Sequence, residues 1–266
     1  MKNNPLGIFD SGIGGLTILK KVMELLPHED TVYFGDTARL PYGEKSPESI
    51  IRYSLQNAHF LSLHKIKLLV IACHTASAYS AKLLREQFSI PVIDVIEPAI
   101  ACAVEASISK KIAVLGTRAT INSGIYEKKI KECKPDAEII SVACPLLVPL
   151  VEENFLSHRA TKLIIQEYLK PIIHKKFDTV ILGCTHYPRL FPLIQEVLGV
   201  HVTIIDSAAA CAQEILNELK RNTLAKPPSE IEKRQYYVSD DPEKFKRLGE
   251  NFLGKIMERV SLYKEL

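Results

Sequence analysis

The sequence predicts an α/β protein with two similar domains, each with a mainly parallel sheet flanked by helices. Short runs of apolar, β-branched residues alternate with longer amphipathic stretches along the chain. Nearly every position in these runs is apolar and each run ends in a small or polar residue, which is typical of strands covered by helices on both faces. The same succession of motifs also occurs twice. The predicted strands are 5–10, 31–36, 67–73, 90–95, 111–117, 138–144, 178–184 and 201–206.

The repetition is clearest around two cysteines. Segments 68–79 (LLVIACHTASAY) and 179–190 (TVILGCTHYPRL) each pass from a strand through a cysteine and small polar residues into a helix. Further along, Asp94 ends one strand as Asp206 ends another, at nearly the same offset. Duplication of one α/β half is the simplest explanation, so the two domains are expected to be pseudo-duplicates.

The domain boundaries follow from this repeat. We expect one domain at 1–97 plus 207–266 and the second at 98–206, with a surface linker at 223–233 whose two prolines cannot continue a helix. Open parallel sheets bind ligands at the carboxyl ends of their strands. The active site is therefore expected in a cleft where the carboxyl ends of the two sheets face each other.

Composition restricts the class of protein. The chain has 266 residues, of which 47% are hydrophobic and 24% charged, and its net charge is +3. Basic residues are scattered, so no nucleic-acid groove is expected. No apolar stretch reaches the roughly 20 residues of a membrane span, and the N-terminus lacks a signal-peptide core, so we expect a cytoplasmic protein without a membrane partner. Six cysteines in this setting are expected to be reduced.

Two of the cysteines are candidates for acid/base chemistry. Cys73 and Cys184 each sit where a strand turns into a helix, and free backbone N–H groups there favour an anion. Either thiol could have its pKa drawn down from about 8.5, so that a thiolate acts as a base. The alternative is a buried, inert core cysteine. That alternative is the prediction for Cys102, Cys133, Cys144 and Cys211.

A zinc site is the second alternative for these loops. Cys73, His74, Cys184 and His186 are all zinc-type ligands. However, adjacent residues at a strand end point in divergent directions, and neither half contains C-x₂-C or H-x₃-H spacing. We therefore expect no metal.

The glycine-rich segment 10–16 (DSGIGGL) does not fit a phosphate loop. It lacks the spacing of the dinucleotide-binding motif, and Asp10 would repel phosphate. A carboxylate suits a ligand with an ammonium group, and Ser11 adds a hydroxyl beside it; the alternative is an N-cap for the first helix. Segment 35–43 (GDTARLPYG) reads as a stiff turn. No lysine lies at a strand end beside a phosphate cradle, so pyridoxal chemistry is not supported and no cofactor is expected.

Taken together, these segments resemble the glutamate racemases, within the aspartate/glutamate racemase superfamily, over essentially the whole chain. The resemblance implies two α/β domains facing each other, no cofactor or metal, and a homodimer. It also implies reversible interconversion of L- and D-glutamate that supplies D-glutamate for peptidoglycan. The blocks that carry it are FDSGIGGL (9–16), GDTARLPYG (35–43), AC-x-TASA around Cys73, GTRAT (116–120), PLLVPLVEE (145–153) and GCTHYP (183–188).

The resemblance also implies roles for individual residues. Cys73 and Cys184 correspond to the two acid/base thiols, which Asp10 and His186 assist on opposite sides of the substrate. Such a reaction needs a base on one face of the α-carbon and an acid on the other. The positions implied to bind or border the substrate are Asp10, Ser11, Tyr42, Gly43, His74, Thr75, Thr117, Thr120, Glu152, Thr185 and His186.

His74 departs from the family pattern, which usually has Asn at this position. A histidine is larger than Asn and can become cationic near pH 6.5, or it can keep the same hydrogen bond through one ring nitrogen. Three other functions stay open: an aspartate or other amino-acid racemase of the same superfamily, a thiol hydrolase that pairs Cys184 with His186, and a non-catalytic binding role with a site altered at His74. Oligomeric geometry and regulators are not predicted.

Overall fold

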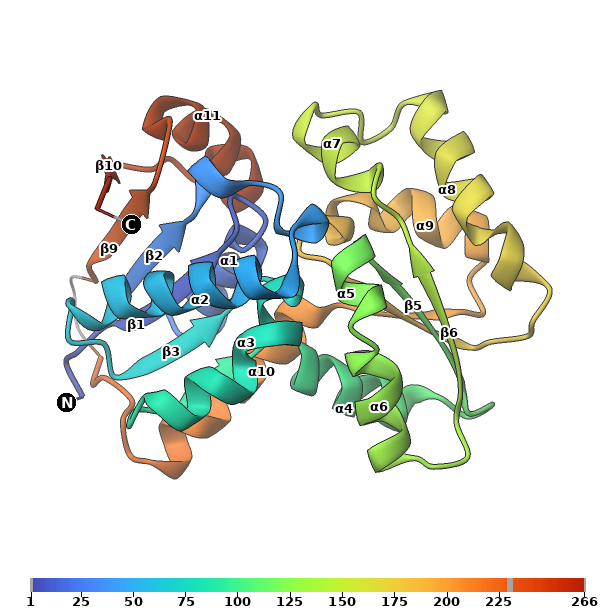
Figure 1. Ribbon diagram of the computed structural model, residues 1–266, viewed down its shortest axis with the longest axis horizontal. Helices are drawn as coiled ribbons and strands as arrows, with labels where there is room; N and C mark the ends of the chain where they lie inside the picture. Colours follow the sequence, from blue (N-terminus) through green and yellow to red (C-terminus); the bar gives the residue numbers. More distant parts are fainter. Residues whose placement is uncertain (1, 229–231, 266) are drawn as a thin grey trace. The chain divides into compact units, whose positions relative to one another are not determined.

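The computed structural model describes residues 2–228 and 232–265 (Figure 1). Contacts within the chain divide it into two compact units, one formed by Met1–Val95 with Ala208–Leu266 and the other by Ile96–Ser207. The first unit is therefore assembled from segments that are far apart in the sequence.

The first unit contains a six-stranded parallel sheet in the order β10-β9-β2-β1-β3-β4. Strands β1, β2 and β3 are buried at every position, as expected for strands with helices on both faces. The elements are β1 Leu6–Asp10, α1 Leu16–Leu25, β2 Thr31–Gly35, the 3₁₀ turns η1 Thr37–Arg39 and η2 Tyr42–Glu44, α2 Pro47–Ser62, β3 Leu68–Ile71, α3 His74–Gln87, β4 Val92–Asp94, α10 Ser207–Arg221, β9 Arg234–Val238, α11 Pro242–Leu253 and β10 Val260–Leu262.

The second unit contains a four-stranded parallel sheet in the order β6-β5-β7-β8. Its edge strand β6 is only partly covered, whereas β7 is buried throughout. The elements are α4 Ile96–Ala106, β5 Lys111–Gly116, α5 Arg118–Asn122, α6 Ile125–Cys133, β6 Glu138–Ala143, α7 Leu147–Glu152, α8 Arg159–Ile173, β7 Thr179–Gly183, the 3₁₀ turn η3 Tyr187–Leu190, α9 Phe191–Leu198 and β8 Thr203–Ile205.

The two sheets share one topology. In the first unit the chain moves from β1 outward to β2 and then back past β1 to β3, and in the second it moves in the same way through β5, β6 and β7. Parallel crossovers are right-handed, so the reversal of direction places successive connecting helices on opposite faces. All eight predicted strands and the two-sheet α/β fold are confirmed. Strands β3 and β7 hold equivalent places in their sheets.

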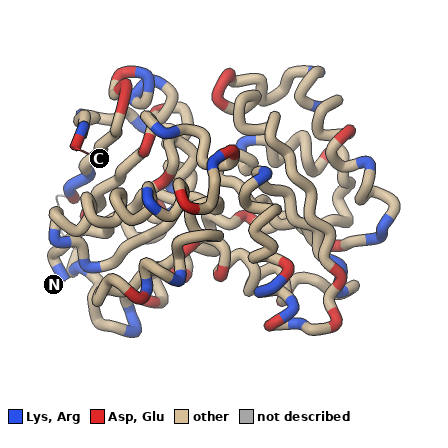
Figure 2. The backbone as a smooth tube through the Cα atoms, in the orientation of Figure 1, with Lys and Arg blue, Asp and Glu red and all other residues tan. Residues whose placement is uncertain are grey.

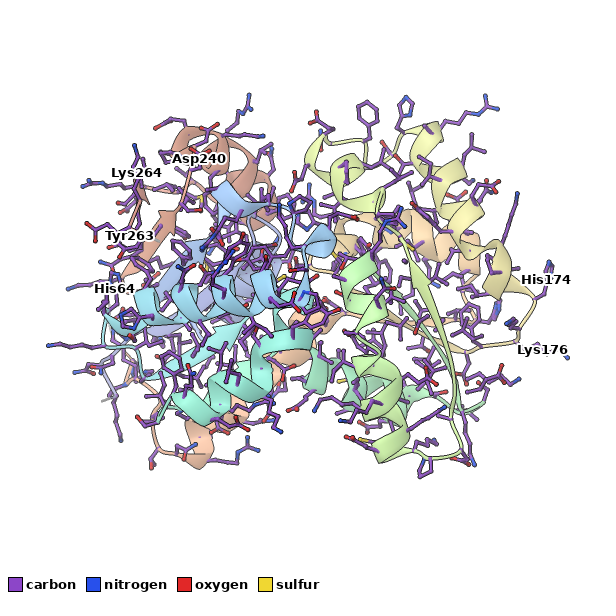
Figure 3. The ribbon with its side chains drawn as sticks, in the orientation of Figure 1. His64, His174, Lys176, Asp240, Tyr263 and Lys264 are labelled. Atoms are coloured by element: carbon purple, nitrogen blue, oxygen red, sulfur yellow. The ribbon has the colours of Figure 1, made fainter. Side chains whose placement is uncertain are left out.

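Strands β9 and β10 were not predicted. They lie at the edge of the first sheet, and an aromatic cluster holds them against α2: the Phe60 ring centroid is 4.3 Å from that of Tyr263, 5.2 Å from that of Tyr237 and 5.0 Å from that of His64. His64 and Tyr263 are labelled in Figure 3. The predicted linker 223–233 precedes β9, and its residues 229–231 lie outside the described residues.

Positions of Lys and Arg are interspersed with positions of Asp and Glu along the backbone of each unit (Figure 2). Within residues 2–228 and 232–265, none of the helices has both the length and the apolar character that a bilayer crossing requires.

Candidate active site

Cys73 lies at the junction between β3 and α3. It is 6% exposed and is the N-cap residue of α3, where its Sγ accepts a hydrogen bond from the Ala76 amide at 3.5 Å. The thiol also lies 3.7 Å from Ser11 Oγ, the hydroxyl that follows β1. A helix N-terminus stabilises negative charge and is a common setting for reactive thiolates. The predicted position of Cys73 at a strand-to-helix turn is confirmed.

Asp10 is the last residue of β1 and is fully buried. Its Oδ2 accepts from the Gly12 amide at 2.9 Å, and its carbonyl accepts from the Asp36 amide at 3.0 Å. The Tyr33 hydroxyl donates to Gly12 O nearby. Burial raises the pKa of Tyr33 well above 10, and negative charge at Asp10 and Cys73 raises it further, so the phenol is a permanent donor. The N-cap of α1 is Gly15, so neither Asp10 nor Ser11 caps this helix.

Gly15 keeps this corner tightly packed. A Cβ atom there would lie 2.6 Å from Asp10 Cβ, 2.8 Å from the Tyr33 hydroxyl and 3.0 Å from Ala72 Cβ, all in a rigid, buried setting. Gly15→Ala is therefore expected to displace Asp10, to cost about 1–3 kcal/mol in the free energy of unfolding, and to lower activity. Urea denaturation and turnover measure both effects. Gly12→Ala is the control and should cost less stability, because the atoms nearest to its new Cβ belong to the flexible Leu40 side chain.

His74 and Thr75 begin α3 and are 1% and 2% exposed. Burial lowers the pKa of His74 to about 3. The imidazole is therefore neutral at physiological pH, and the interpretation in which His74 becomes cationic near pH 6.5 is wrong. A neutral histidine provides one donor and one acceptor, as an Asn side chain also does at its amide.

This burial predicts acid sensitivity. The folded-state pKa of His74 lies below the ordinary value of 6.5, so its contribution to stability is complete above pH 6.5 and is lost as pH falls toward 3. His74→Asn removes this titration. Below pH 6.5 the free energy of unfolding of the variant should therefore fall less steeply than that of wild type, by up to about 1.4 kcal/mol per pH unit. Urea midpoints of both proteins at pH 7, 6, 5 and 4 test this. Parallel pH curves would contradict the prediction.

Tyr42 and Gly43 are buried in η2. The phenol donates a short hydrogen bond to Asp36 Oδ2 and accepts one from Asn57 Nδ2 at 3.0 Å. Burial and the charge of Asp36 raise the pKa of Tyr42 well above 10, which keeps it protonated.

Cys184 directly follows β7 and is 6% exposed. Thr185 and His186 come next, are 3% and 4% exposed, and lead into η3. The carbonyl of Cys184 accepts from the Tyr187 amide, which fixes the turn. Cys184 therefore occupies the end of β7 as Cys73 occupies the end of β3.

His186 connects Cys184 to an acid. Its Nδ1 lies 3.9 Å from Cys184 Sγ, and its Nε2 lies 3.0 Å from Oε1 of Glu152, the last residue of α7. Burial lowers the pKa of His186, but the hydrogen bonds and charges of Cys184 and Glu152 outweigh it and raise the pKa to about 10. His186 is thus a buried cation between the Cys184 thiol and the Glu152 carboxylate.

Two further predicted residues lie in the second unit. Thr117 is the N-cap of α5, and its Oγ1 accepts from the Thr120 amide at 3.2 Å and lies 2.9 Å from Thr120 Oγ1. Thr120 is 1% exposed. The hydroxyls thus form a pair at the carboxyl end of β5, whose Gly116 is in register with Gly183 of β7.

The other four cysteines divide into two pairs. Cys144 and Cys211 are buried as predicted, and burial raises the pKa of Cys144 to about 12 and that of Cys211 still higher, so both are inert thiols. Cys102 and Cys133 are exposed, so their predicted burial is wrong. Cys102 faces solvent because the buried side of α4 consists of other residues, Ile96, Ala99, Ile100 and Ala103. Cys133 is exposed at the end of α6, where it is the last residue.

Within the described part of the chain, no group of three or more His, Cys, Asp or Glu side chains could hold a metal ion.

The first unit brings Asp10, Ser11 and Cys73 together, and the second brings Cys184, His186 and Glu152 together. Sequence reasoning missed Tyr33 and the partners of Tyr42. Of these partners, Asp36 lay within the motif at 35–43, whereas no sequence signal pointed to Asn57.

The chain is similar to known proteins over most of its length. Residues 14–215 match the family model described as Asp/Glu/Hydantoin racemase. The chain is 47% identical over 249 residues to a glutamate racemase of Geobacter metallireducens, covering 94% of this chain and 92% of that protein.

Two solved structures are similar over nearly the whole chain. A glutamate racemase isoform from Bacillus anthracis has a TM-score of 0.95 at 35% identity, covering 99% of this chain and 98% of that one. The glutamate racemase of Francisella tularensis in complex with D-glutamate has a TM-score of 0.93 at 38% identity, with coverage of 99% and 98%.

Proposed function

Since the chain belongs to the Asp/Glu/Hydantoin racemase family, and within it to the glutamate racemases, which are isomerases, we propose that it interconverts L- and D-glutamate without a cofactor, using Cys73 and Cys184. One observation carries the two-thiol mechanism. Each unit presents one nearly buried thiol at the carboxyl end of an equivalent strand, next to groups that can hold charge or a proton.

The reaction needs two groups because inversion replaces a hydrogen on one face of the α-carbon by a hydrogen on the other. One cysteine, as thiolate, accepts the α-proton, so that the C–H bond breaks and an S–H bond forms. The second cysteine, as thiol, donates its proton to the opposite face and becomes the thiolate. One enantiomer is converted into the other, and the two thiols exchange protonation states.

Thiolate basicity alone does not remove a proton this weakly acidic. The carbanion-like state requires donors aimed at the substrate, each worth a few kcal/mol in a dry site. We assign this role to the hydroxyls of Ser11, Thr75, Thr117 and Thr185, and Thr120 forms a hydroxyl pair with Thr117. Asp10 supports Cys73, and the cationic His186 held by Glu152 supports Cys184.

The biological setting follows from the product. We propose that D-glutamate made here supplies peptidoglycan synthesis, and that the protein acts in the cytoplasm as a homodimer. The bound D-glutamate of the Francisella tularensis structure supports glutamate as the substrate.

The proposed function is tested by incubating metal-free, cofactor-free protein with L-glutamate in D₂O while following optical rotation and α-deuterium. The rotation should decay to zero, and deuterium should appear first in the D-glutamate product, because the donating thiol exchanges with solvent and the accepting thiol does not return its proton. L-aspartate is the comparison substrate and should be inert. Binding of glutamate without deuterium exchange would instead indicate a non-catalytic protein, and racemisation of aspartate alone would indicate a different racemase.

A further inference from the structure

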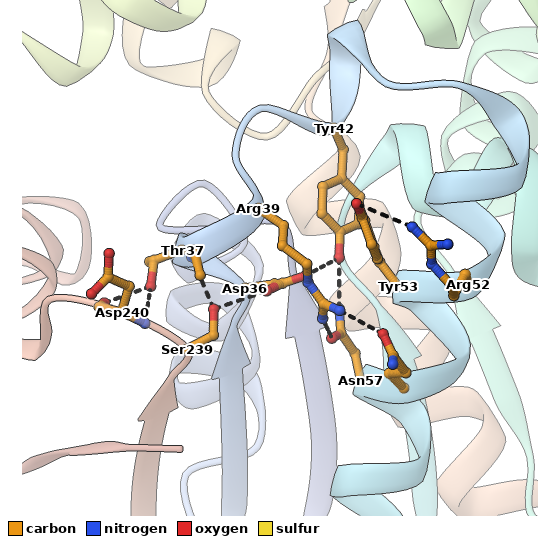
Figure 4. A network of polar contacts seen from close by, with 11 residues as sticks. Asp36, Thr37, Arg39, Tyr42, Arg52, Tyr53, Asn57, Ser239 and Asp240 are labelled. Atoms are coloured by element: carbon orange, nitrogen blue, oxygen red, sulfur yellow. Dashed lines mark hydrogen bonds and ion pairs between the residues drawn. The ribbon is translucent and has the colours of Figure 1, made fainter. Parts of the chain in front are cut away.

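The substrate loop, defined here as residues 37–44, is held from beneath by a closed ring of hydrogen bonds (Figure 4). Asp36 Oδ2 accepts from Arg39 Nε at 2.6 Å and from the Tyr42 hydroxyl. Arg39 Nη2 donates to Asn57 Oδ1 at 2.9 Å, and Asn57 Nδ2 donates to the Tyr42 oxygen at 3.0 Å. The four side chains thus link both ends of the loop to one another and to α2.

The ring lies mostly in the interior, and Arg39 is its one partly exposed side chain, at 17%. Asp36 and Asn57 are 0% exposed and Tyr42 is 1% exposed. The Asp36 carboxylate forms an ion pair with the Arg39 guanidinium. The guanidinium also stacks over the Tyr53 ring, with its Cζ 4.3 Å from the ring centroid. A buried network in which every member is satisfied fixes one geometry, whereas a partly satisfied one is costly.

A second set of bonds ties the loop to the turn between β9 and α11. Ser239 Oγ donates to Asp36 Oδ1 at 2.8 Å and accepts from the Ala38 amide at 2.9 Å. Thr37 and Asp240 exchange two further bonds, since Thr37 Oγ1 donates to the Asp240 carbonyl at 2.6 Å and accepts from its amide at 2.9 Å. A segment about two hundred residues away in the sequence therefore braces this loop.

We propose that Asp36, Arg39, Asn57 and Ser239 are positioning residues that hold the substrate loop in its binding geometry, and that Tyr42 serves the substrate through the position of this loop and not through its hydroxyl. This inference rests on the proposed function, because the loop carries the residues Tyr42 and Gly43 assigned to the substrate. The phenol already donates its proton to Asp36 and accepts from Asn57, so it could donate to a substrate carboxylate only by breaking the ring. Preorganised support of this kind lowers the ordering cost of binding.

The test compares steady-state constants for glutamate in both directions. Ser239→Ala and Arg39→Lys should each raise KM about five- to tenfold, the cost of a lost buried hydrogen bond, and leave kcat within about twofold. Arg52→Lys is the matched control and should keep the wild-type KM, because Arg52 also lies over Tyr53 but, among the described residues, donates to its hydroxyl and not to the ring of hydrogen bonds. Ser239→Thr retains the hydroxyl and should restore the KM.

A double-mutant cycle separates positioning from contact. Tyr42→Phe should raise KM by a similar factor. The KM of the double variant, Tyr42→Phe with Ser239→Ala, should be less than about twofold above the higher KM of the two single variants, because both substitutions act through Asp36. A KM that rises in Tyr42→Phe while Ser239→Ala and Arg39→Lys match wild type would show that the hydroxyl binds substrate and would overturn the inference. So would multiplicative effects in the double variant.

Two controls keep the outcomes distinct. Thermal melting identifies a variant that does not fold, and Arg39→Lys, which keeps the charge, carries the test if Ser239→Ala is lost. Calorimetric titration with D-glutamate should show the same change in Kd as in KM. A wild-type protein that neither turns over nor binds glutamate overturns the proposed function and this inference together, whereas an active wild type with unchanged variants overturns the inference alone.

Discussion

Replacing either Cys73 or Cys184 with serine is expected to lower kcat/KM for glutamate by roughly 10³-fold or more in both directions, within the 10²–10⁴-fold that a positioned acid or base contributes. A serine hydroxyl does not ionise at neutral pH, whereas a thiol with an ordinary pKa of about 8.5 does so readily. Each inversion uses both groups, so neither direction of reaction survives the loss of one. Racemisation followed by circular dichroism from each pure enantiomer measures the effect.

Cys102→Ser is the matched control for these variants. Cys102 is exposed on α4, so its replacement should leave both the rate and the melting temperature unchanged. Calorimetric binding of D-glutamate shows whether the inactive variants retain the site. Substantial racemisation in either Cys73→Ser or Cys184→Ser would rule out the two-thiol mechanism.

Loss of His186 is expected to have the next largest effect. His186→Asn removes the buried cation beside Cys184 and should lower kcat by about 10²-fold, at the lower end of the range for acid/base assistance. His174→Asn changes an exposed histidine of the same unit, labelled in Figure 3, and should have no effect on kcat. A His186→Asn enzyme with wild-type kcat would remove His186 from the mechanism.

Glu152→Gln tests the same pair through pH. The folded-state pKa of His186, about 10, lies above its ordinary value of 6.5. The stability contributed by the cation is therefore complete below pH 6.5 and is lost as pH rises toward 10. Removing the Glu152 carboxylate lowers this pKa, so the alkaline fall in kcat should begin at lower pH than in wild type. The fall in urea midpoint should still begin near pH 6.5, but it should level off at lower pH and be smaller than in wild type. Profiles measured from pH 6 to 10.5 decide the matter, and superimposable profiles would exclude Glu152 from this role.

The parts of the fold that could be predicted are those whose signal lies in their own residues. Strands such as β1 and β7 are buried at every position, so an uninterrupted apolar run identifies them. Strand β9 (RQYYV) is fully buried only at alternate positions, and none of the residues of β10 is fully buried, so neither stands out from its surroundings. Their place in the sheet is set by tertiary contacts: β9 pairs with β2, β10 pairs with β9, and Phe60 packs against Tyr237 and Tyr263.

The same distinction holds in the site. The strand-end positions of Cys73 and Cys184 follow from local pattern, because a parallel strand must end where the next helix begins. The neutral state of His74 and the cationic state of His186 depend on burial and on Glu152, which lies 34 residues away in the sequence. The bond from Ser239 to Asp36 spans 203 residues and has no local signature at all.

Assembly of the first unit from two distant segments has a consequence for synthesis on the ribosome. The second unit, Ile96–Ser207, is translated in full before β9 exists. Until then, the nascent first sheet ends at β2, an unpaired edge of the kind that invites association with other chains. Pairing of β9 with β2 covers that edge, and Ser239, which directly follows β9, bonds to Asp36. A nascent chain therefore acquires its protected sheet edge and its braced loop together.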